Sequence, residues 1–423
     1  MSVLGSKVKD VKGKSMEASI AKHDRQASNG RWAGIMPGDA SWFYSFFLPP
    51  PLFIWRYFRL PSTFAGILNW VEKAEHISLS GVRPSDSEIP NILAGKAKDS
   101  TEAELEEYLS PIVQKIPKDV IEDVQVAGTI FNFGRWRCFL LGASEYLDSA
   151  PELARTVQFL TRRIEQEKEM RLAFQEIAGS NKSDDEKQKD IEHDLFSRLI
   201  LPKEIIDLFL SDYSLLSRVG MEGHGENSLV RLELSVQIDF VLSLLANVEL
   251  GLIEYLEEQG KSRRDWIATC GELGIMYWVL PFSGESKVST PFCRFIDGVR
   301  CRFGSPDKPI SWAKLSAYIP VAEEVISNGN KLQNQRSTLR EWRKGKTLAS
   351  MPRLNGFLEA FSGDDVERNC LIVLGQASVA LTRLYMDQVR AVRDDGFADA
   401  DRLVASVYQQ YTLHRAKAFR PSM

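Results

Sequence analysis

Positive charge is concentrated in one short stretch of this sequence. Between residues 336 and 353, six Lys or Arg residues are accompanied by a single acidic residue, Glu341, whereas the whole chain of 423 residues carries a formal net charge of −4. Lys and Arg side chains gathered in this way bind phosphate groups and displace the counterions that surround a nucleic-acid backbone. The stretch is therefore a candidate phosphate-binding surface in an acidic protein. The six residues are Arg336, Arg340, Arg343, Lys344, Lys346 and Arg353.

Two helices are predicted to present these charges. Leu339 and Trp342 lie three positions apart, so they share one side of a helix. Gly345 follows at the position where the C-terminus of a helix favours a positive φ. Ser350 is expected to cap a second helix. The apolar stripe of that second helix consists of Leu354, Phe357, Leu358 and Phe361.

The segment 310–361 resembles the lambda-repressor-like (Cro/XRE-type) helix-turn-helix family. The recognition helix of that family carries an apolar residue, then a Trp and a basic residue, then a Gly, and an apolar helix follows a polar turn. Residues 310–316, ISWAKLS, are similar to the start of the family's second helix. The matching residues downstream are Leu339, Trp342, Lys344 and Gly345, followed by Ser350, Leu354, Phe357 and Phe361.

The chain departs from the family pattern at three points. Ala349 stands where the family usually has Pro, and Arg343 stands where it usually has Glu. The interval between Leu315 and Leu339 is also longer than in the family. These departures favour either an insertion in the turn or a resemblance limited to the second half of the motif.

The resemblance implies that the helix around residues 335–343 enters a major groove of double-stranded DNA. Its N-terminal polar residues would then face base edges, and the basic residues after it would neutralise phosphates. The residues alone also fit a helical hairpin with a solvated basic face, or a helix-turn-helix fold used for protein contact. The expected DNA-binding set is Gln335, Arg336, Ser337, Arg340, Arg343, Lys344 and Lys346.

An aromatic-rich segment near the N-terminus is a second candidate interaction site. Nine aromatic residues lie between residues 42 and 58, and prolines at 49–51 interrupt them. Arg56 and Arg59 lie at the end of this segment. A membrane-spanning helix needs about 20 continuous apolar residues, so no spanning segment is predicted here. The segment is expected either to dock into the protein's own core or to bind a partner protein. The candidate partner-binding residues are Trp42, Phe46, Phe47, Trp55 and Phe58.

The Cys and His residues exclude several kinds of site. The chain has five of each, and neither a CxxC nor an HExxH motif occurs, so no disulfide framework and no metal site are predicted. Phosphate-loop, nucleophile-elbow and dinucleotide motifs are also missing from the sequence, and no cofactor is expected. Free thiols are typical of a reducing compartment, which favours a cytoplasmic location. No catalytic residue is predicted, although a site assembled from distant residues remains open.

Periodicity divides the chain into mostly helical parts. Strong helical patterns cover residues 150–178, 229–259, 364–393 and 398–418, and the best strand pattern, a weak one, covers 276–280. The charged run 179–194 is interpreted as a boundary or an exposed loop. The expected parts are a mobile basic tail (1–34), an aromatic-rich helical region (35–180), a central bundle (195–305), the helix-turn-helix-like module (306–362) and a C-terminal helical pair (363–423).

The sequence therefore predicts an all-α protein, a multi-helix bundle with an embedded helix-turn-helix-like module. The favoured function is that of a DNA-associated regulatory or accessory protein of bacterial type, with double-stranded DNA as its partner. A non-catalytic protein–protein interaction factor is the first alternative, with the aromatic segment as its contact. An enzyme of unfamiliar type is the second.

Overall fold

The computed structural model describes residues 47–49, 117–127, 131–142, 150–202, 204, 225–261, 274–283, 288–304, 308–321, 330–361, 363–394 and 398–420. Most of these residues are helical, and the strands among them form one short antiparallel pair, β1 (Phe282–Ser283) with β2 (Val288–Ser289). The predicted all-α class is confirmed.

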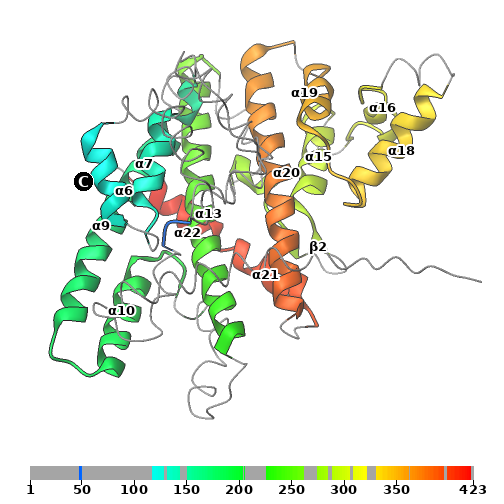
Figure 1. Cartoon of the computed structure of the whole chain (residues 1–423). Coiled ribbons are helices and arrows are strands. Elements are labelled where there is room, and N and C mark those ends of the chain that lie inside the picture. Colours follow the sequence, from blue (N-terminus) through cyan, green and yellow to red (C-terminus); the bar gives the residue numbers. More distant parts are fainter. Residues whose placement is uncertain are drawn as a thin grey trace, which may run out of the picture.

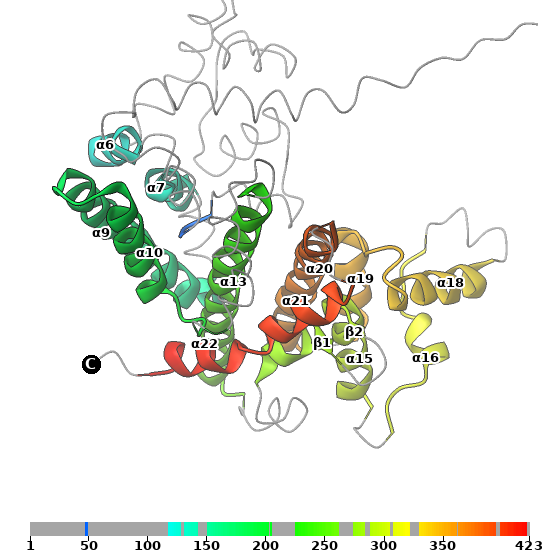
Figure 2. The same ribbon diagram turned by 90° about the horizontal axis from the view of Figure 1, so that it is seen from below.

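Helix α13 (Gly225–Glu258) lies at the centre, with a group of helices on either side (Figures 1 and 2). On one side are α6 (Lys118–Ala127), α7 (Phe133–Gly142), the short helix η2 (Pro151–Leu153), α9 (Ala154–Gly179) and α10 (Asp184–Arg198). On the other are η3 (Ile275–Trp278), α15 (Pro291–Arg302), α16 (Trp312–Ser316), α18 (Lys331–Arg343), α19 (Met351–Glu359) and α20 (Asp365–Asp394). The last helices are α21 (Ala400–Tyr408), which contacts α20, and α22 (Tyr411–Ala418), which contacts α13.

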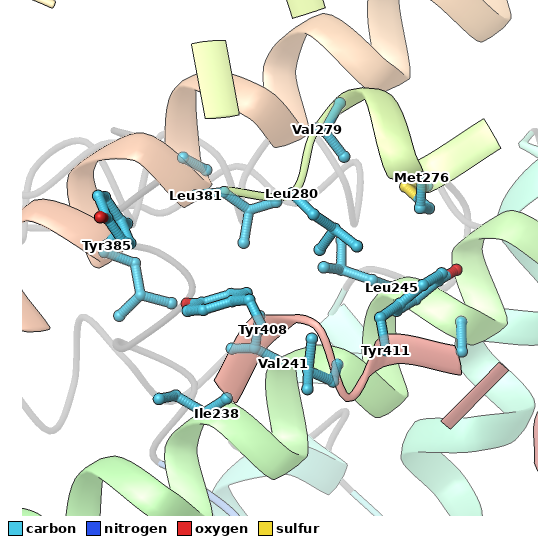
Figure 3. Close-up of a cluster of buried hydrophobic side chains, with 14 of the residues drawn as sticks. Ile238, Val241, Leu245, Met276, Val279, Leu280, Leu381, Tyr385, Tyr408 and Tyr411 are labelled. Atoms are coloured by element: carbon cyan, nitrogen blue, oxygen red, sulfur yellow. The ribbon is translucent and has the colours of Figure 1, made fainter. Parts of the chain in front are cut away.

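The core joins these two groups around α13. Figure 3 shows Ile238, Val241 and Leu245 of α13 directed towards Tyr408 and Tyr411, which come from α21 and α22. The same cluster receives side chains from the η3 segment and from α20. Because α13 is apolar on more than one side, it can bury surface against both groups at once. The other labelled side chains are Met276, Val279, Leu280, Leu381 and Tyr385.

Part of α13 has the length and apolar composition of a membrane-spanning helix. Within the described residues, Val236–Glu258 is long and apolar enough to cross a membrane. Most of that stretch is buried against other elements of the protein. Its apolar character is therefore accounted for by its central place in the bundle, and it is weak evidence for a membrane location.

Most of the charged run 179–194 is helical rather than the expected exposed loop. Residues 180–183 connect α9 to α10, and residues from Asp184 onwards form α10, whose first turn is closed by a capping box between Ser183 and Glu186. Ile191 and Leu195 on α10 are fully buried, and α10 packs against α9. The expectation of an exposed loop is wrong from Asp184 onwards, because these two apolar side chains anchor an otherwise polar helix.

The other predicted elements have mixed outcomes. The long helices expected at 150–178, 229–259 and 364–393 correspond to α9, α13 and α20. The helix expected at 398–418 is interrupted at Gln409 and Gln410 and forms α21 and α22. The strand expected at 276–280 is wrong: most of it forms η3, and the strands lie just downstream.

Candidate nucleic-acid interface

Helix α18 is fixed to the rest of the protein by its inner side. Leu339 and Trp342 are each only 2% exposed. The Trp342 ring lies edge-on to Phe292 of α15 and to Phe357 of α19, with ring centroids 5.6 and 5.7 Å apart. Edge-to-face aromatic contacts of this kind add to the free energy of burial. The predicted core role of Leu339 and Trp342 is confirmed, and it determines which side of α18 faces outwards.

Gln335 lies on the inner side of α18, not on its outer side. Its side chain is 1% exposed, and its amide nitrogen donates to the carbonyls of Ala317 and Ile319 at 2.9 and 2.8 Å. These bonds hold α18 against the segment that follows α16. The expectation that Gln335 faces a base edge therefore does not fit the structure, and Gln335 is not part of the outer side of α18.

The outer side of α18 carries a row of cations. Arg336, Arg340 and Lys344 follow one another at intervals of four residues, so they lie along one side of the helix. All three are exposed, and none takes part in an ion pair in the described parts of the chain. Ser337 and Lys346, also in the expected DNA-binding set, are exposed as well. We call Arg336, Arg340 and Lys344 the outer row.

The end of α18 has the geometry that the sequence predicted. Gly345 has a φ of +63°, and its N–H donates to the carbonyl of Trp342, while the N–H of Lys346 donates to that of Glu341. This pair of bonds is a Schellman motif, which satisfies carbonyls that the helix end leaves open. Ser350 occupies the N-cap position of α19, but its side chain makes no capping hydrogen bond.

Arg343 differs from its neighbours because it stacks on an aromatic ring. Its guanidinium carbon lies 3.7 Å from the ring centroid of Trp312, the first residue of α16. Arg300 of α15 contacts the same ring at 4.3 Å. The carbonyl of Arg343 also accepts a hydrogen bond from the Cys293 thiol at 3.0 Å. The end of α18 is thereby tied to both α16 and α15.

The aromatic segment near the N-terminus is described only at residues 47–49, and there it is docked. Phe47 is fully buried, and the guanidinium carbon of Arg163 lies 3.6 Å from its ring centroid. The carbonyls of Phe47, Leu48 and Pro49 accept hydrogen bonds from Arg163, Asn132 and Trp136. The expectation that Phe47 binds a partner is therefore wrong: it is a core residue. Trp42, Phe46, Trp55 and Phe58 lie outside the described residues.

A buried polar group that the sequence did not suggest lies between α13 and α22. The Ser243 hydroxyl is 2.9 Å from Nδ1 of His414, and Nε2 of His414 is 3.8 Å from Asp239. All three side chains are at most 3% exposed, and burial lowers the pKa of His414 to about 4. A hydrolytic site needs access for substrate, so we assign this group to packing. Ser243 and His414 are 171 residues apart, which hides the pair from motif searches.

Two of the thiols in the described part of the chain lie in surroundings that disfavour the thiolate. Burial raises the pKa of Cys301 and raises that of Cys370 to about 12, which keeps both thiols protonated. No group of three or more His, Cys, Asp or Glu residues that could hold a metal ion is found there. Comparison of the whole chain with protein-family models, with curated proteins and with solved structures gave no match.

Proposed function

We propose that this protein binds double-stranded DNA through the outer side of α18 and acts as a DNA-associated regulatory or accessory factor. The observation that carries the proposal is the outer row. Its three cations are exposed, they lack carboxylate partners in the described residues, and they lie on a helix whose inner side is held by the core. Charges arranged in this way remain available for phosphates outside the protein.

The position of α18 supports this proposal. Figures 1 and 2 place α16 and α18 at the edge of the molecule, on the side of α19 and α20 away from α13. A helix at an edge can approach the major groove, which is about 12 Å wide, without the bundle blocking it. Helix α16 precedes α18 and contacts it, an order that fits the proposed helix-turn-helix-like arrangement of bacterial type.

Within this proposal, the residues of α18 have different roles. Arg336, Ser337 and Arg340 lie within the helix and would reach base edges, where Arg recognises guanine by paired hydrogen bonds. Lys344 and Lys346 follow the helix end and would contact phosphates, which set the register but carry little sequence information.

The test is DNA binding across a salt series. Fluorescence anisotropy with a labelled mixed-sequence duplex would compare the wild type with the triple variant Arg336→Gln/Arg340→Gln/Lys344→Gln. Arg336 and Arg340 are assigned to base edges and Lys344 to a phosphate, so the variant should bind more weakly at every salt concentration, and the slope of log affinity against log salt should fall by about one. A triple variant with the wild-type affinity and slope would refute the proposal.

The matched control removes three positive charges from exposed residues away from α18. Arg162, Lys417 and Arg420 are exposed cations that line a cleft between α9, α13 and residues 417–420, away from α18. The variant Arg162→Gln/Lys417→Gln/Arg420→Gln changes the net charge by the same amount as the outer-row variant. Equal loss of binding in both variants would indicate a non-specific charge effect and would favour the alternative of a protein-interaction factor.

A further inference from the structure

A second site lies beside the end of α18. A cleft of about 660 Å³ opens between η3, α15, the first residue of α16 and the last residue of α18. Its volume falls within the range that holds small organic ligands. Three aromatic side chains line it: Tyr277 and Trp278 from η3 and Trp312 from α16.

Arg294 lines this cleft, and it takes part in no ion pair within the described residues. Its guanidinium carbon lies 4.3 Å from the Tyr277 ring centroid and 5.0 Å from that of Phe282, and it donates to the Tyr277 carbonyl at 2.8 Å. Its Nε atom is buried, and no hydrogen-bond partner for it is found in the described part of the chain. Burial lowers the pKa of Arg294, because taking the guanidinium out of water disfavours its charged form.

The charges that line the cleft leave it positive overall. The carboxylate that lines the cleft, Asp297, pairs with Arg300 at 2.9 Å, so these two charges cancel. Arg343 enters from the opposite wall without an ion pair in the described residues. The cleft therefore carries two net positive charges, one of them partly desolvated. A partly buried cation without an ion pair in the described residues is destabilising, and an anion entering the cleft would relieve that cost.

We propose that this cleft binds the phosphate group of a ligand, with Arg294 and Arg343 as its two anchors. Guanidinium groups bind phosphate through paired hydrogen bonds, and a phosphate has enough oxygens to be held from two walls at once. The aromatic lining suits a phosphate ester with an organic part. The group has two possible sources, a soluble phosphate ester or the DNA backbone. The phosphate site itself does not depend on the proposed DNA contact of the outer row.

The walls of the cleft are held in place by their own packing. A Cβ atom on Gly298 of α15 would lie 2.7 Å from the Trp278 ring, so only glycine permits this close approach of α15 to η3. The Cys293 thiol links α15 to the end of α18. Arg294 and Arg343 are therefore held on elements that contact each other.

The first experiment measures ligand binding directly. Isothermal titration of the full-length chain with pyrophosphate and with AMP should show one site, and the affinity should fall at least tenfold in Arg294→Met/Arg343→Met. The single variant Arg343→Met tests the site at a more exposed position than Arg294, and its circular dichroism spectrum and urea midpoint should match those of the wild type. The control Arg162→Met/Arg420→Met removes two exposed arginines that lie outside both the cleft and the outer row, and it should bind both probes within about twofold of wild type.

A second experiment identifies the source of the phosphate. If the ligand is the DNA backbone, the probes bind weakly, and Arg343→Met lowers the salt slope of duplex binding by about one. If it is a soluble ester, AMP binds and that slope stays unchanged. The proposal is overturned if the wild type binds no probe and Arg343→Met leaves DNA binding unaltered, or if the cleft variants bind probes as the wild type does. The outer-row variant tests the proposed function separately.

Discussion

Two charged residues where α9 meets α13 lie inside the protein, whereas those along the outer side of α18 lie on its surface. Arg163 and Asp239 are at most 3% exposed, and each has partners supplied by the fold. The outer row has none in the described residues. The same residue types thus serve two purposes, and burial distinguishes them: the inner charges hold segments together, and the outer ones are available to a partner.

The inner charges connect segments that are distant in the sequence. Asp239 of α13 accepts the backbone N–H groups of Ile200 and Leu201 at 2.7 and 2.9 Å and pairs with Arg163 of α9. Arg163 in turn holds the carbonyl of Phe47. One buried pair therefore organises α9, α13, the segment after α10 and the docked segment 47–49.

The largest expected effect follows from removing Asp239. Asp239→Ala leaves the Arg163 guanidinium and two backbone N–H groups buried without their acceptor, which costs about 3–5 kcal/mol. Urea unfolding followed by circular dichroism measures this loss. The matched control is Asp387→Ala on α20, whose partner Arg390 is 69% exposed; it should cost less than about 1 kcal/mol. Similar losses in the two variants would contradict the structural role of the inner charges.

A second prediction concerns the pH dependence of stability. Glu167 is fully buried, and its carboxylate accepts the N–H of Asn132 at 2.9 Å. Burial raises its pKa from 4.5 to about 8. The folded protein therefore keeps a proton on Glu167 at pH values where the unfolded chain has lost it. The stability that this group contributes is complete below about pH 4.5 and is lost as the pH rises towards 8.

The variant Glu167→Gln isolates this effect, because Gln keeps a side-chain acceptor but does not titrate. Between pH 5 and pH 8, the free energy of unfolding of the wild type should fall relative to that of the variant by at least about 1.4 kcal/mol, the equivalent of one pKa unit. His414, whose pKa is lowered to about 4, titrates in the same range with the opposite sign, but it is present in both proteins and cancels. Parallel stability curves would show that Glu167 is not held neutral.

The difference between the two regions also explains how much could be predicted from the sequence. Helices α9 and α20 could be predicted because their apolar residues repeat at helical spacing. The end of α18 could be predicted because Gly345 is the residue type that favours a positive φ at a helix C-terminus. These are local signals. Helix α10 gave a weak signal, since two buried apolar residues, Ile191 and Leu195, anchor a segment made mostly of charges.

The positions of individual polar side chains were not predictable, because their partners are distant in the sequence. Gln335 is polar and lies on a basic helix, yet its side chain points into the protein, where it donates to the carbonyls of Ala317 and Ile319, 18 and 16 residues earlier. Arg343 is in a run of cations, but its guanidinium stacks on the Trp312 ring and lines the cleft. The pairing of Arg163 with Asp239 spans 76 residues. Periodicity identified the outer side of α18 but not these tertiary contacts.

The smallest expected effect on stability belongs to the outer row. In Arg336→Gln/Arg340→Gln/Lys344→Gln, two like-charged pairs at four-residue spacing are removed, which stabilises a helix by about 0.2–0.5 kcal/mol per pair. Against this, Arg340 and Lys344 lie near the C-terminus of α18, where a cation is worth about 0.3–1 kcal/mol. The two effects offset, so urea unfolding should give a free energy within about 0.5 kcal/mol of wild type. A loss above about 2 kcal/mol would mean that the outer row is structural, and the contrast with the inner charges would fail. An unchanged stability together with lost DNA binding would mean that these cations contribute to a partner contact and not to the fold.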